Sequence, residues 1–386
     1  MLTLAVTYAG VLGGLERELI DLPPGLPGRV VVACPEGPLA NGAREAGIDV
    51  RPIASRPLEL HGSSGAAAAN LAGHAREVRS LVRELGPDLV VAWGMRSAIA
   101  AAAVVRAVPR RPGLLFRHLD FLPGGAVGRA VRMAARSADR VSVCSQAVGR
   151  DLDPAGELKD RLSVVYPGID LTRLAPGGEP GREREVLLLG AIEPWKRPDL
   201  ALEALALARS ELPDVRLTVA GAPIGEAGHR LLAELRRRAD RPDLAGHVTF
   251  AGSLDDPAGA LRRAWCLLHC SEREPFGRVM AEALAVGRPV VAPDSAGPAE
   301  IVDPSCGVLY RPGDAADAAA ALVEVLGDPG RARALGAAGP ARAALFDLER
   351  TRARFGVDAR AAAERRLGAP RSEATPARHS AIVVTW

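Results

Sequence analysis

The stretch from Ser271 to Val302, SEREPFGRVMAEALAVGRPVVAPDSAGPAEIV, restricts most strongly what this chain can fold into. It begins with a loop that carries Glu274. A helix is predicted next, because apolar residues recur there at helical spacing and Gly287 is a residue suited to end it. The segment from Pro289 to Ala292 then has the character of a short buried strand. The sequence therefore predicts a loop, a helix and a buried strand in direct succession.

The start of this predicted helix suits a phosphate group. A helix N-terminus presents free backbone N–H groups and partial positive charge, which favours an anion there. Glu274 lies just ahead of this point, and Glu282 lies roughly 7.5 Å along the helix axis at 1.5 Å per residue. Ionised carboxylates accept hydrogen bonds, which suits the hydroxyls at the two ends of a nucleotide sugar. The predicted donor-binding residues of this stretch are Phe276, Gly277, Arg278, Val279 and Glu282.

The same stretch resembles the donor-site signature of the retaining glycosyltransferases of family 4. Seven residues separate the two glutamates, Pro-Phe-Gly follows the first, and Gly-x-Pro-Val-Val follows the second. The resemblance implies the GT-B fold, in which two Rossmann-like domains face each other across a cleft. It also implies that Glu274 acts catalytically against the donor sugar and that Glu282 holds the ribose. The alternative, for either glutamate alone, is a solvated residue on an amphipathic helix.

Strand-like runs alternate with helical segments along the rest of the chain. Arg29 to Cys34, Leu89 to Ala92 and Leu114 to Arg117 are predicted strands of this kind. Such alternation indicates an α/β fold with parallel sheets covered on both faces. Two domains are expected, because 386 residues exceed the usual size of a single core. With the resemblance, we predict an acceptor-side domain (1–173), a linker (174–185), a nucleotide-sugar-binding domain (186–347), a helix crossing back to the first domain (348–370) and a tail (371–386).

Two places in the first domain are predicted to face the donor. Gly13 and Gly14 follow the first strand and permit close backbone approach to a phosphate, with a helix expected from Leu15. This loop resembles the family's Gly-Gly-x-Glu loop, and a plain tight turn is the alternative. His118 ends a predicted strand, where ligands bind in parallel sheets. The family often has a catalytic His at this point, and the alternative is a His satisfied by a local carbonyl.

The loop after the strand from Val186 to Gly190 is predicted to meet the donor diphosphate. In the family it commonly reads Gly-Arg-x-x-x-x-Lys, with both cations against the phosphates. Lys196 matches, which implies a catalytic and a donor-binding role, whereas Ala191 stands where the Arg is expected. Arg197 and Arg278 are the candidates to replace the missing cation. The alternative for Lys196 is a surface residue that precedes a helix.

Further predicted strand ends resemble places where the family's backbone meets the nucleobase and the sugar. The residues concerned are Gly221, Ser253 and Leu254.

Arginines recur at three- and four-residue spacing on a helix predicted from Gly128 to Arg140. Arg129, Arg132, Arg136 and Arg140 would then share one face. Many family 4 enzymes act on lipid-linked acceptors, so this face suits peripheral contact with anionic lipid at the inner face of a membrane. A solvated surface helix is the alternative.

Composition and charge exclude several other functions. A net charge of +3 is too small for a dedicated nucleic-acid binder, so no nucleic-acid partner is expected. No apolar run is long enough to span a membrane, and the chain enters its first strand without a charged leader, which predicts a cytoplasmic protein. Cys266 and Cys270 lack the further ligands of a zinc site, so no metal is expected and the cysteines are predicted to be buried thiols.

Together with these observations, the resemblance implies a metal-independent, retaining hexosyltransferase that needs no cofactor beyond its nucleotide diphosphate sugar. The acceptor would be a hydroxyl of a sugar, a lipid-linked glycan or a small molecule, in glycan, glycolipid or natural-product biosynthesis. Two alternatives remain open. One is a sugar-nucleotide epimerase on the same fold, and the other, motivated by Ala191, is a catalytically impaired donor-binding or scaffolding partner.

Overall fold

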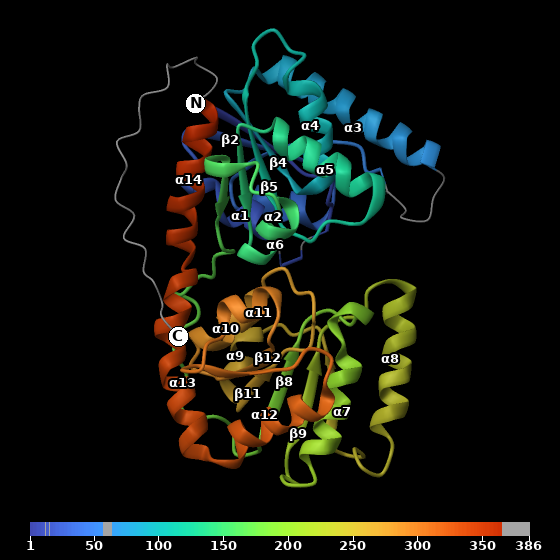
Figure 1. Cartoon of the computed structure of the whole chain (residues 1–386), viewed down its shortest axis with the longest axis vertical. Helices are drawn as coiled ribbons and strands as arrows, with labels where there is room; N and C mark the ends of the chain where they lie inside the picture. The colour runs from blue at the N-terminus through green and yellow to red at the C-terminus, as the bar shows by residue number, and fades with distance from the viewer. Residues whose placement is uncertain (12, 15, 57–63, 365–386) are drawn as a thin grey trace.

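Two parallel β-sheets, one from each half of the chain, form the centre of the structure (Figure 1). The computed structural model describes residues 1–11, 13–14, 16–56 and 64–364. Within them, seven strands pair in the order β3-β2-β1-β4-β5-β6-β7 and six in the order β10-β9-β8-β11-β12-β13. The α/β class and the two Rossmann-like domains expected from the sequence are confirmed.

The strands of the first sheet are short and mostly apolar, as expected for strands that helices cover on both faces. All five residues of β4, for example, are buried. The strands are β1 (Leu2–Val6), β2 (Arg29–Cys34), β3 (Asp49–Pro52), β4 (Leu89–Trp93), β5 (Gly113–His118), β6 (Arg140–Val143) and β7 (Leu162–Val164). The helical segments are α1 (Glu18–Asp21), η1 (Pro23–Gly25), α2 (Pro38–Glu45), α3 (Ser64–Leu85), α4 (Gly94–Val105), α5 (Gly125–Ser137), α6 (Gln146–Leu152) and η2 (Lys159–Arg161).

The second sheet repeats this construction. Its strands are β8 (Glu185–Leu189), β9 (Arg216–Ala220), β10 (Val248–Gly252), β11 (Cys266–Leu268), β12 (Val290–Pro293) and β13 (Gly307–Tyr310). The helical segments of this half, followed by the last helix of the chain, are η3 (Pro194–Lys196), α7 (Pro198–Ala208), α8 (Gly225–Ala239), α9 (Pro257–Arg263), α10 (Arg278–Ala285), α11 (Ala296–Ile301), α12 (Ala315–Gly327), α13 (Pro329–Ala343), η4 (Ala344–Phe346) and α14 (Leu348–Glu364).

Each sheet reverses its strand order once, and the reversal determines where a ligand can bind. The first sheet turns between β1 and β4, and the second between β8 and β11. In open parallel sheets, ligands bind beyond the carboxyl ends of the strands at such a switch point. The loops that follow β1 and β8 carry Gly13, Gly14, Lys196 and Arg197, so four predicted site residues lie at these two positions.

The last described helix, α14, returns to the first domain. In Figure 1 it continues upward from α13, which belongs to the second domain, along the side of the first sheet. Its Phe355 is fully buried and packs edge-on against Trp93, with ring centroids 5.6 Å apart. Arg352 Nε donates to Asp21 O over 2.7 Å. The predicted C-terminal helix that crosses back is therefore confirmed over residues 348–364.

Two predicted helices have different bounds in the structure. The helix expected from Leu15 begins at Glu18, and Leu15 itself lies outside the described residues. The helix expected to reach Arg140 is α5 and ends at Ser137. It ends there because Asp139 N donates to Leu114 O over 2.8 Å, which aligns the chain with β5. Arg140 is consequently the first residue of β6, so the prediction of four arginines on one helix face was wrong.

Some predictions fall outside the described part of the chain. The tail at 371–386 lies there entirely, as does the end of the crossing helix at 365–370. Among the described residues, no helix is both long and apolar enough to cross a membrane. All five cysteines are buried and free, as predicted.

Candidate functional site

The loop between β11 and α10 holds Glu274 in a fixed position. Gly277 ends this loop with φ of +95°, in the left-handed region that favours glycine. A Cβ there would lie 2.3 Å from Met280 Cε and 3.1 Å from Glu274 Cγ. From α11, Gly297 N donates to Glu274 O over 3.0 Å. The conformation at Gly277 and this backbone bond together place the Glu274 side chain.

The Glu274 carboxylate is buried and meets two nitrogen groups. It is 7% exposed, and its Oε2 forms an ion pair with Lys196 Nζ. His269 Nε2 lies 3.3 Å from the same oxygen. Burial alone would raise the pKa of Glu274, but His269 and Lys196 outweigh it and lower that pKa to about 2. Glu274 is therefore ionised at neutral pH and can accept hydrogen bonds but cannot supply a proton.

Lys196 and Arg197 follow β8 but have different partners. The ammonium of Lys196 lies 3.9 Å from the ring centroid of Trp195 and reaches Glu274. Arg197 has φ of +52°, and its guanidinium contacts Asp199 over 3.1 Å and also Glu272. Arg197 is thus held between two carboxylates, whereas Lys196 lies against the predicted catalytic glutamate.

Ala191 lies close to Lys196 and His269. All three residues line one small cavity. The backbone here is tight, because a Cβ on Gly221 would lie 1.9 Å from Gly190 O. Glycine at 221 therefore lets the ends of β8 and β9 approach each other. Ala191 has no charged group, so this position supplies no cation beside Lys196.

Ser253 and Leu254, also predicted to meet the donor, directly follow β10. Ser253 is exposed, and Leu254 is half-buried against the apolar cluster that includes Phe276.

Helix α10 reaches across to the first domain through Arg278. Its Nη1 donates to Gly14 O over 2.9 Å and lies 3.8 Å from Asp21 Oδ2. The Gly13–Gly14 loop therefore presents a carbonyl oxygen to this arginine. Arg278 Nε also lies 3.8 Å from Glu282 Oε1. Burial raises the pKa of Glu282, and the charge of Arg278 opposes that shift.

Phe276 and Val279 contribute apolar packing. The Phe276 ring is 1% exposed and lies 5.7 Å from the Tyr166 ring and 5.4 Å from the Phe346 ring, centroid to centroid. Val279 is half-buried against the same cluster. The buried ring of Phe276 therefore leaves only the backbone of this residue to contact a donor.

His118 ends β5 and is completely buried. Burial, followed by the charge of Arg117, lowers the pKa of His118 to about 3, so its imidazole is neutral at physiological pH. Among the described residues, neither ring nitrogen has a hydrogen-bond partner. His118 O accepts from Cys144 N over 3.1 Å, and Cys144 Sγ lies 3.9 Å from Pro275 O. The structure thus brings His118 close to the loop that carries Glu274, at the interdomain junction where the strand-end loops of both sheets meet.

Three residues at this junction were not predicted from the sequence. His269 directly follows β11, as His118 ends β5, and this shared position is a signal that could have identified it. Asp120 is exposed, but partial desolvation of its carboxyl, followed by the like charge of Glu274, raises the pKa of that group. Glu300 accepts from Gln146 N over 2.9 Å and from Ala147 N over 2.8 Å, which forms a second contact between the domains.

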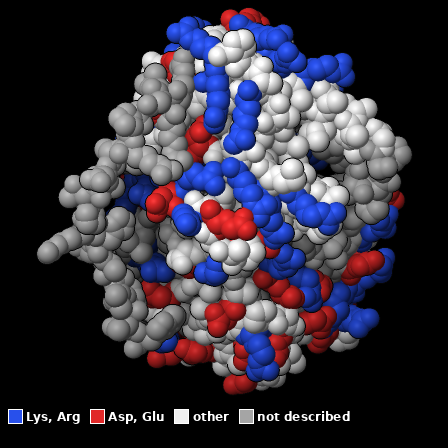
Figure 2. Space-filling model, turned by 45° about the horizontal axis from the view of Figure 1, so that its top comes forward, with Lys and Arg blue, Asp and Glu red and all other residues white. Residues whose placement is uncertain are grey.

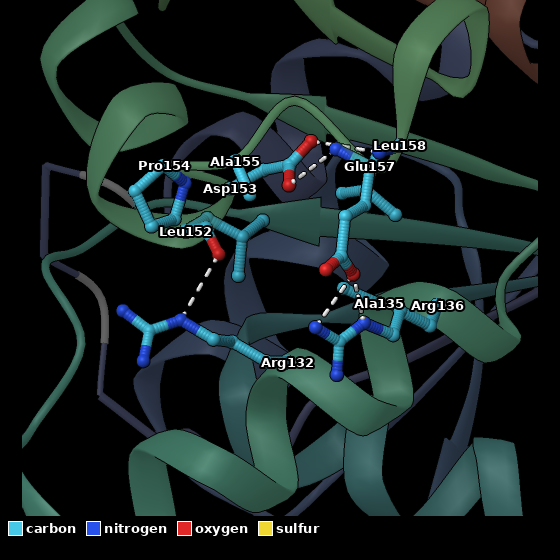
Figure 3. Close-up of a pocket in the computed structure, with 9 residues that line it drawn as sticks. All are labelled: Arg132, Ala135, Arg136, Leu152, Asp153, Pro154, Ala155, Glu157 and Leu158. Carbon is cyan, nitrogen blue, oxygen red and sulfur yellow. Dashed lines mark hydrogen bonds and ion pairs between the residues drawn. The ribbon is translucent and has the colours of Figure 1, made fainter.

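One cavity of the first domain is separate from this junction. It has a volume of about 190 Å³ and is lined by α5 and the segment that follows α6 (Figure 3). Arg132 Nη2 donates to Asp151 O over 2.9 Å, and Arg136 Nε donates to Glu157 Oε2 over 2.6 Å. The two arginines of this cavity are therefore engaged locally, and it adds nothing to the predicted donor site.

Metal ligands do not gather in the described part of the chain, where no three His, Cys, Asp or Glu side chains come together as a metal-binding group.

Two family profiles together match most of the chain. Residues 12–173 match the profile described as Glycosyltransferase Family 4, and residues 173–342 match the one described as Glycosyl transferases group 1. The two profiles meet at residue 173, between the two sheets.

Curated relatives include the D-inositol 3-phosphate glycosyltransferases of Mycobacterium tuberculosis and Mycobacterium bovis. Each is 37% identical to this chain over 214 residues, which is 52% of this chain. The matched segment spans only 42% of the length of these relatives.

Solved structures share the whole architecture. Anabaena HepE in complex with UDP-glucose has a TM-score of 0.80 at 24% identity, over 92% of this chain and 98% of that one. Sucrose-phosphate synthase from Thermosynechococcus elongatus has a TM-score of 0.76 at 20% identity, over 92% of this chain and 97% of that one. At these identities the likeness shows the fold alone.

Proposed function

The chain belongs to glycosyltransferase family 4, and from this premise we propose that it transfers a sugar from a nucleotide diphosphate sugar to an acceptor hydroxyl, with retention of the anomeric configuration. One observation carries the proposal most directly. A buried, ionised Glu274 meets Lys196 at the junction of the two domains, although 77 residues separate them in the sequence (positions 196 and 274). A carboxylate suits the hydroxyls of a donor sugar, and an ammonium suits its phosphates.

Each charged residue of the site is assigned to one part of the donor. Lys196 would leave Glu274 for the diphosphate, where the departing nucleotide develops negative charge. Glu282 would hold the ribose, because it lies one helix turn beyond Arg278 on α10. Arg278 would need to exchange its bond to Gly14 O if it were to meet the phosphates. The protein's own cations would therefore neutralise the donor, without a metal ion or cofactor.

The neutral imidazole of His118 fits the acceptor side of this reaction. A buried polar group without a partner costs about 1–3 kcal/mol, so a hydroxyl that reaches its ring nitrogens would be favoured there. His118 cannot act as a cation near pH 7, because its pKa is about 3. We assign it the role of orienting a sugar or acceptor hydroxyl.

A UDP-hexose is the first donor to test. The similar structure of HepE holds UDP-glucose, and the curated relatives are named for a phosphorylated inositol acceptor. For this chain, a sugar, a lipid-linked glycan and a small polyol are the acceptor classes that we propose to screen. The product would enter a glycan, a glycolipid or a glycosylated natural product.

Peripheral contact with a membrane would involve the outer face of α5. This helix exposes Val127 (50%) and Met133 (65%), and it also exposes Arg129. Figure 2 shows Lys and Arg side chains gathered in a band across the visible face. Exposed apolar and basic side chains on one surface helix suit the inner face of an anionic bilayer.

Vesicle flotation tests this contact. The wild-type chain should float with vesicles that contain anionic lipid and not with neutral ones, and Met133→Glu should abolish flotation. Leu207→Glu is the matched control, since Leu207 is 50% exposed on α7 of the second domain. Equal flotation of all three proteins would exclude α5 as the contact.

Ala191 favours a second candidate function, a donor-binding partner with impaired turnover. The family's Arg is absent from this position beside Lys196. Such a protein would bind nucleotide sugar but would release no nucleotide when an acceptor is added.

Product analysis tests the proposed reaction. Purified chain is incubated with a UDP-hexose and the acceptor panel, and the anomeric configuration of the product is read by NMR. We expect acceptor-dependent nucleotide release and a product with the configuration of the donor. An inverted product would refute retention, and binding without release would support the impaired partner.

A further inference from the structure

His269 is held rigidly at the end of β11. Its backbone N donates to Val291 O over 2.8 Å, and its O accepts from Tyr310 Oη over 2.9 Å. The residue is 4% exposed. Because β12 and β13 anchor its backbone from neighbouring strands, the direction of its side chain is determined by the sheet.

The imidazole of His269 and the ammonium of Lys196 meet the same carboxylate oxygen. Both groups lie against Oε2 of Glu274. Among the residues that the structure describes, none forms a hydrogen bond with Oε1 of this glutamate. Two nitrogen groups on one oxygen therefore determine how the carboxylate plane is rotated and leave its other oxygen to accept a hydroxyl of the donor sugar.

The two nitrogen groups differ in how firmly they are held. Lys196 is the last residue of a short 3₁₀ segment, and its long side chain can move to a phosphate. His269 has a short side chain on a strand end and cannot follow the ligand. When Lys196 leaves Glu274 for the diphosphate, His269 is the group that stays.

The separation between His269 and Glu274 fits a contact that tightens during the reaction. At 3.3 Å it exceeds the usual 2.9–3.0 Å of an N–H···O hydrogen bond. Catalytic hydrogen bonds commonly shorten once substrate is in place. Within the described part of the chain, this buried nitrogen has no hydrogen-bond partner, and Glu274 Oε2 is the carboxylate oxygen that lies near it.

We propose that His269 is a positioning residue for sugar transfer: it donates its Nε2 proton to Glu274 and keeps that carboxylate aligned with the donor sugar while Lys196 moves to the diphosphate. This inference rests on the proposed function. It assigns His269 no contact with the substrate and no proton transfer during the reaction.

Two variants of His269 separate alignment from packing. His269→Leu keeps much of the volume but removes the donor, and His269→Gln keeps an N–H group near the position of Nε2. The kcat of His269→Leu should fall by about 10- to 100-fold, since small misplacement of a reacting group can cost about a hundredfold. Its affinity for UDP or GDP alone should not change, because neither carries the sugar. His269→Gln should recover most of the rate. Equal rates in the two variants, or a wild-type rate in His269→Leu, would overturn the proposal.

A second measurement needs no turnover. The side-chain carboxyl of Glu274 is titrated by carbon NMR, with Glu274→Gln to assign its signal. In wild type and in His269→Gln the pKa should stay near 2, and in His269→Leu it should rise. An unchanged pKa in His269→Leu would overturn the proposal. If no donor is turned over by the wild type, the proposed function fails and the titration still decides whether His269 aligns Glu274.

Discussion

Replacing Lys196 by Ala removes the ammonium that pairs with Glu274 and lies over Trp195. The environment of Glu274 lowers its pKa from 4.5 to about 2, which corresponds to roughly 3 kcal/mol at 1.36 kcal/mol per pKa unit. His269 and Lys196 share this effect, so we assign about 1–2 kcal/mol of folding stability at pH 7 to Lys196.

The stability loss should depend on pH in a defined direction. A carboxyl whose folded-state pKa is lowered stabilises the protein fully above its ordinary pKa of 4.5, and that contribution is lost as the pH falls through about 2. The deficit of Lys196→Ala in urea denaturation should therefore be complete above pH 4.5 and disappear toward pH 2.

The same substitution should impair transfer more than donor binding. A cation that meets the leaving diphosphate matters more in the transition state than in the ground state. The transfer rate at saturating donor should fall at least tenfold, which is about 1.4 kcal/mol of barrier. Lys196→Arg should recover only part of the rate, since a planar guanidinium has a different donor geometry.

Lys159→Ala is the matched control for Lys196→Ala. Lys159 lies in η2 of the first domain, and its replacement should leave the transfer rate unchanged. A wild-type rate for Lys196→Ala at saturating donor, with an unchanged free energy of unfolding, would refute both the catalytic role and the pairing with Glu274.

Three further predictions concern other charges of the molecule. Glu282→Ala should weaken binding of UDP or GDP in calorimetry as well as transfer, because the nucleotide alone carries the ribose; an unchanged affinity would exclude Glu282 as the ribose ligand. Ala191→Arg should raise nucleotide release by supplying the missing cation, and equal or lower release from a folded variant would mean that another group already supplies that charge. Glu18→Gln should lower the free energy of unfolding by about 3–5 kcal/mol, because Arg117 is 0% exposed and would lose its buried carboxylate partner. A loss below about 1 kcal/mol in urea denaturation would show that the remaining bonds of Arg117 suffice.

The sequence predicted the sheets well because their signal is local. A short apolar run and the helical periodicity that follows it can each be recognised from a few consecutive residues. The strands of a buried parallel sheet consist of such apolar runs. The loop, helix and strand expected from Ser271 onward are observed as the Glu274 loop, α10 and β12. Helix bounds were less certain, as Arg140 shows, since the end of α5 depends on a backbone bond between Asp139 and Leu114.

The sequence identified the residues of the candidate site, but it did not identify the residues that each of them contacts. The roles given to Glu274, Lys196 and His118 came from the family resemblance, and they remain predictions. No local pattern could show that Arg278 donates to Gly14, because this bond depends on how the two domains meet.

His269 illustrates the same limit. In the sequence it is a single histidine between apolar residues, and only the folded structure shows that its ring lies near Glu274.

The most direct test of the central claim is nucleotide release from a panel of UDP- and GDP-sugars, by wild type and by Glu274→Gln, with and without acceptor. At 100 times its dissociation constant, a true donor should also add about 2.7 kcal/mol to the stability of both proteins. We predict that at least one donor gives acceptor-dependent release in wild type and at least tenfold less in Glu274→Gln. Equal release by the two proteins, or no stabilisation by any nucleotide sugar, would contradict a donor site built around Glu274 and Lys196.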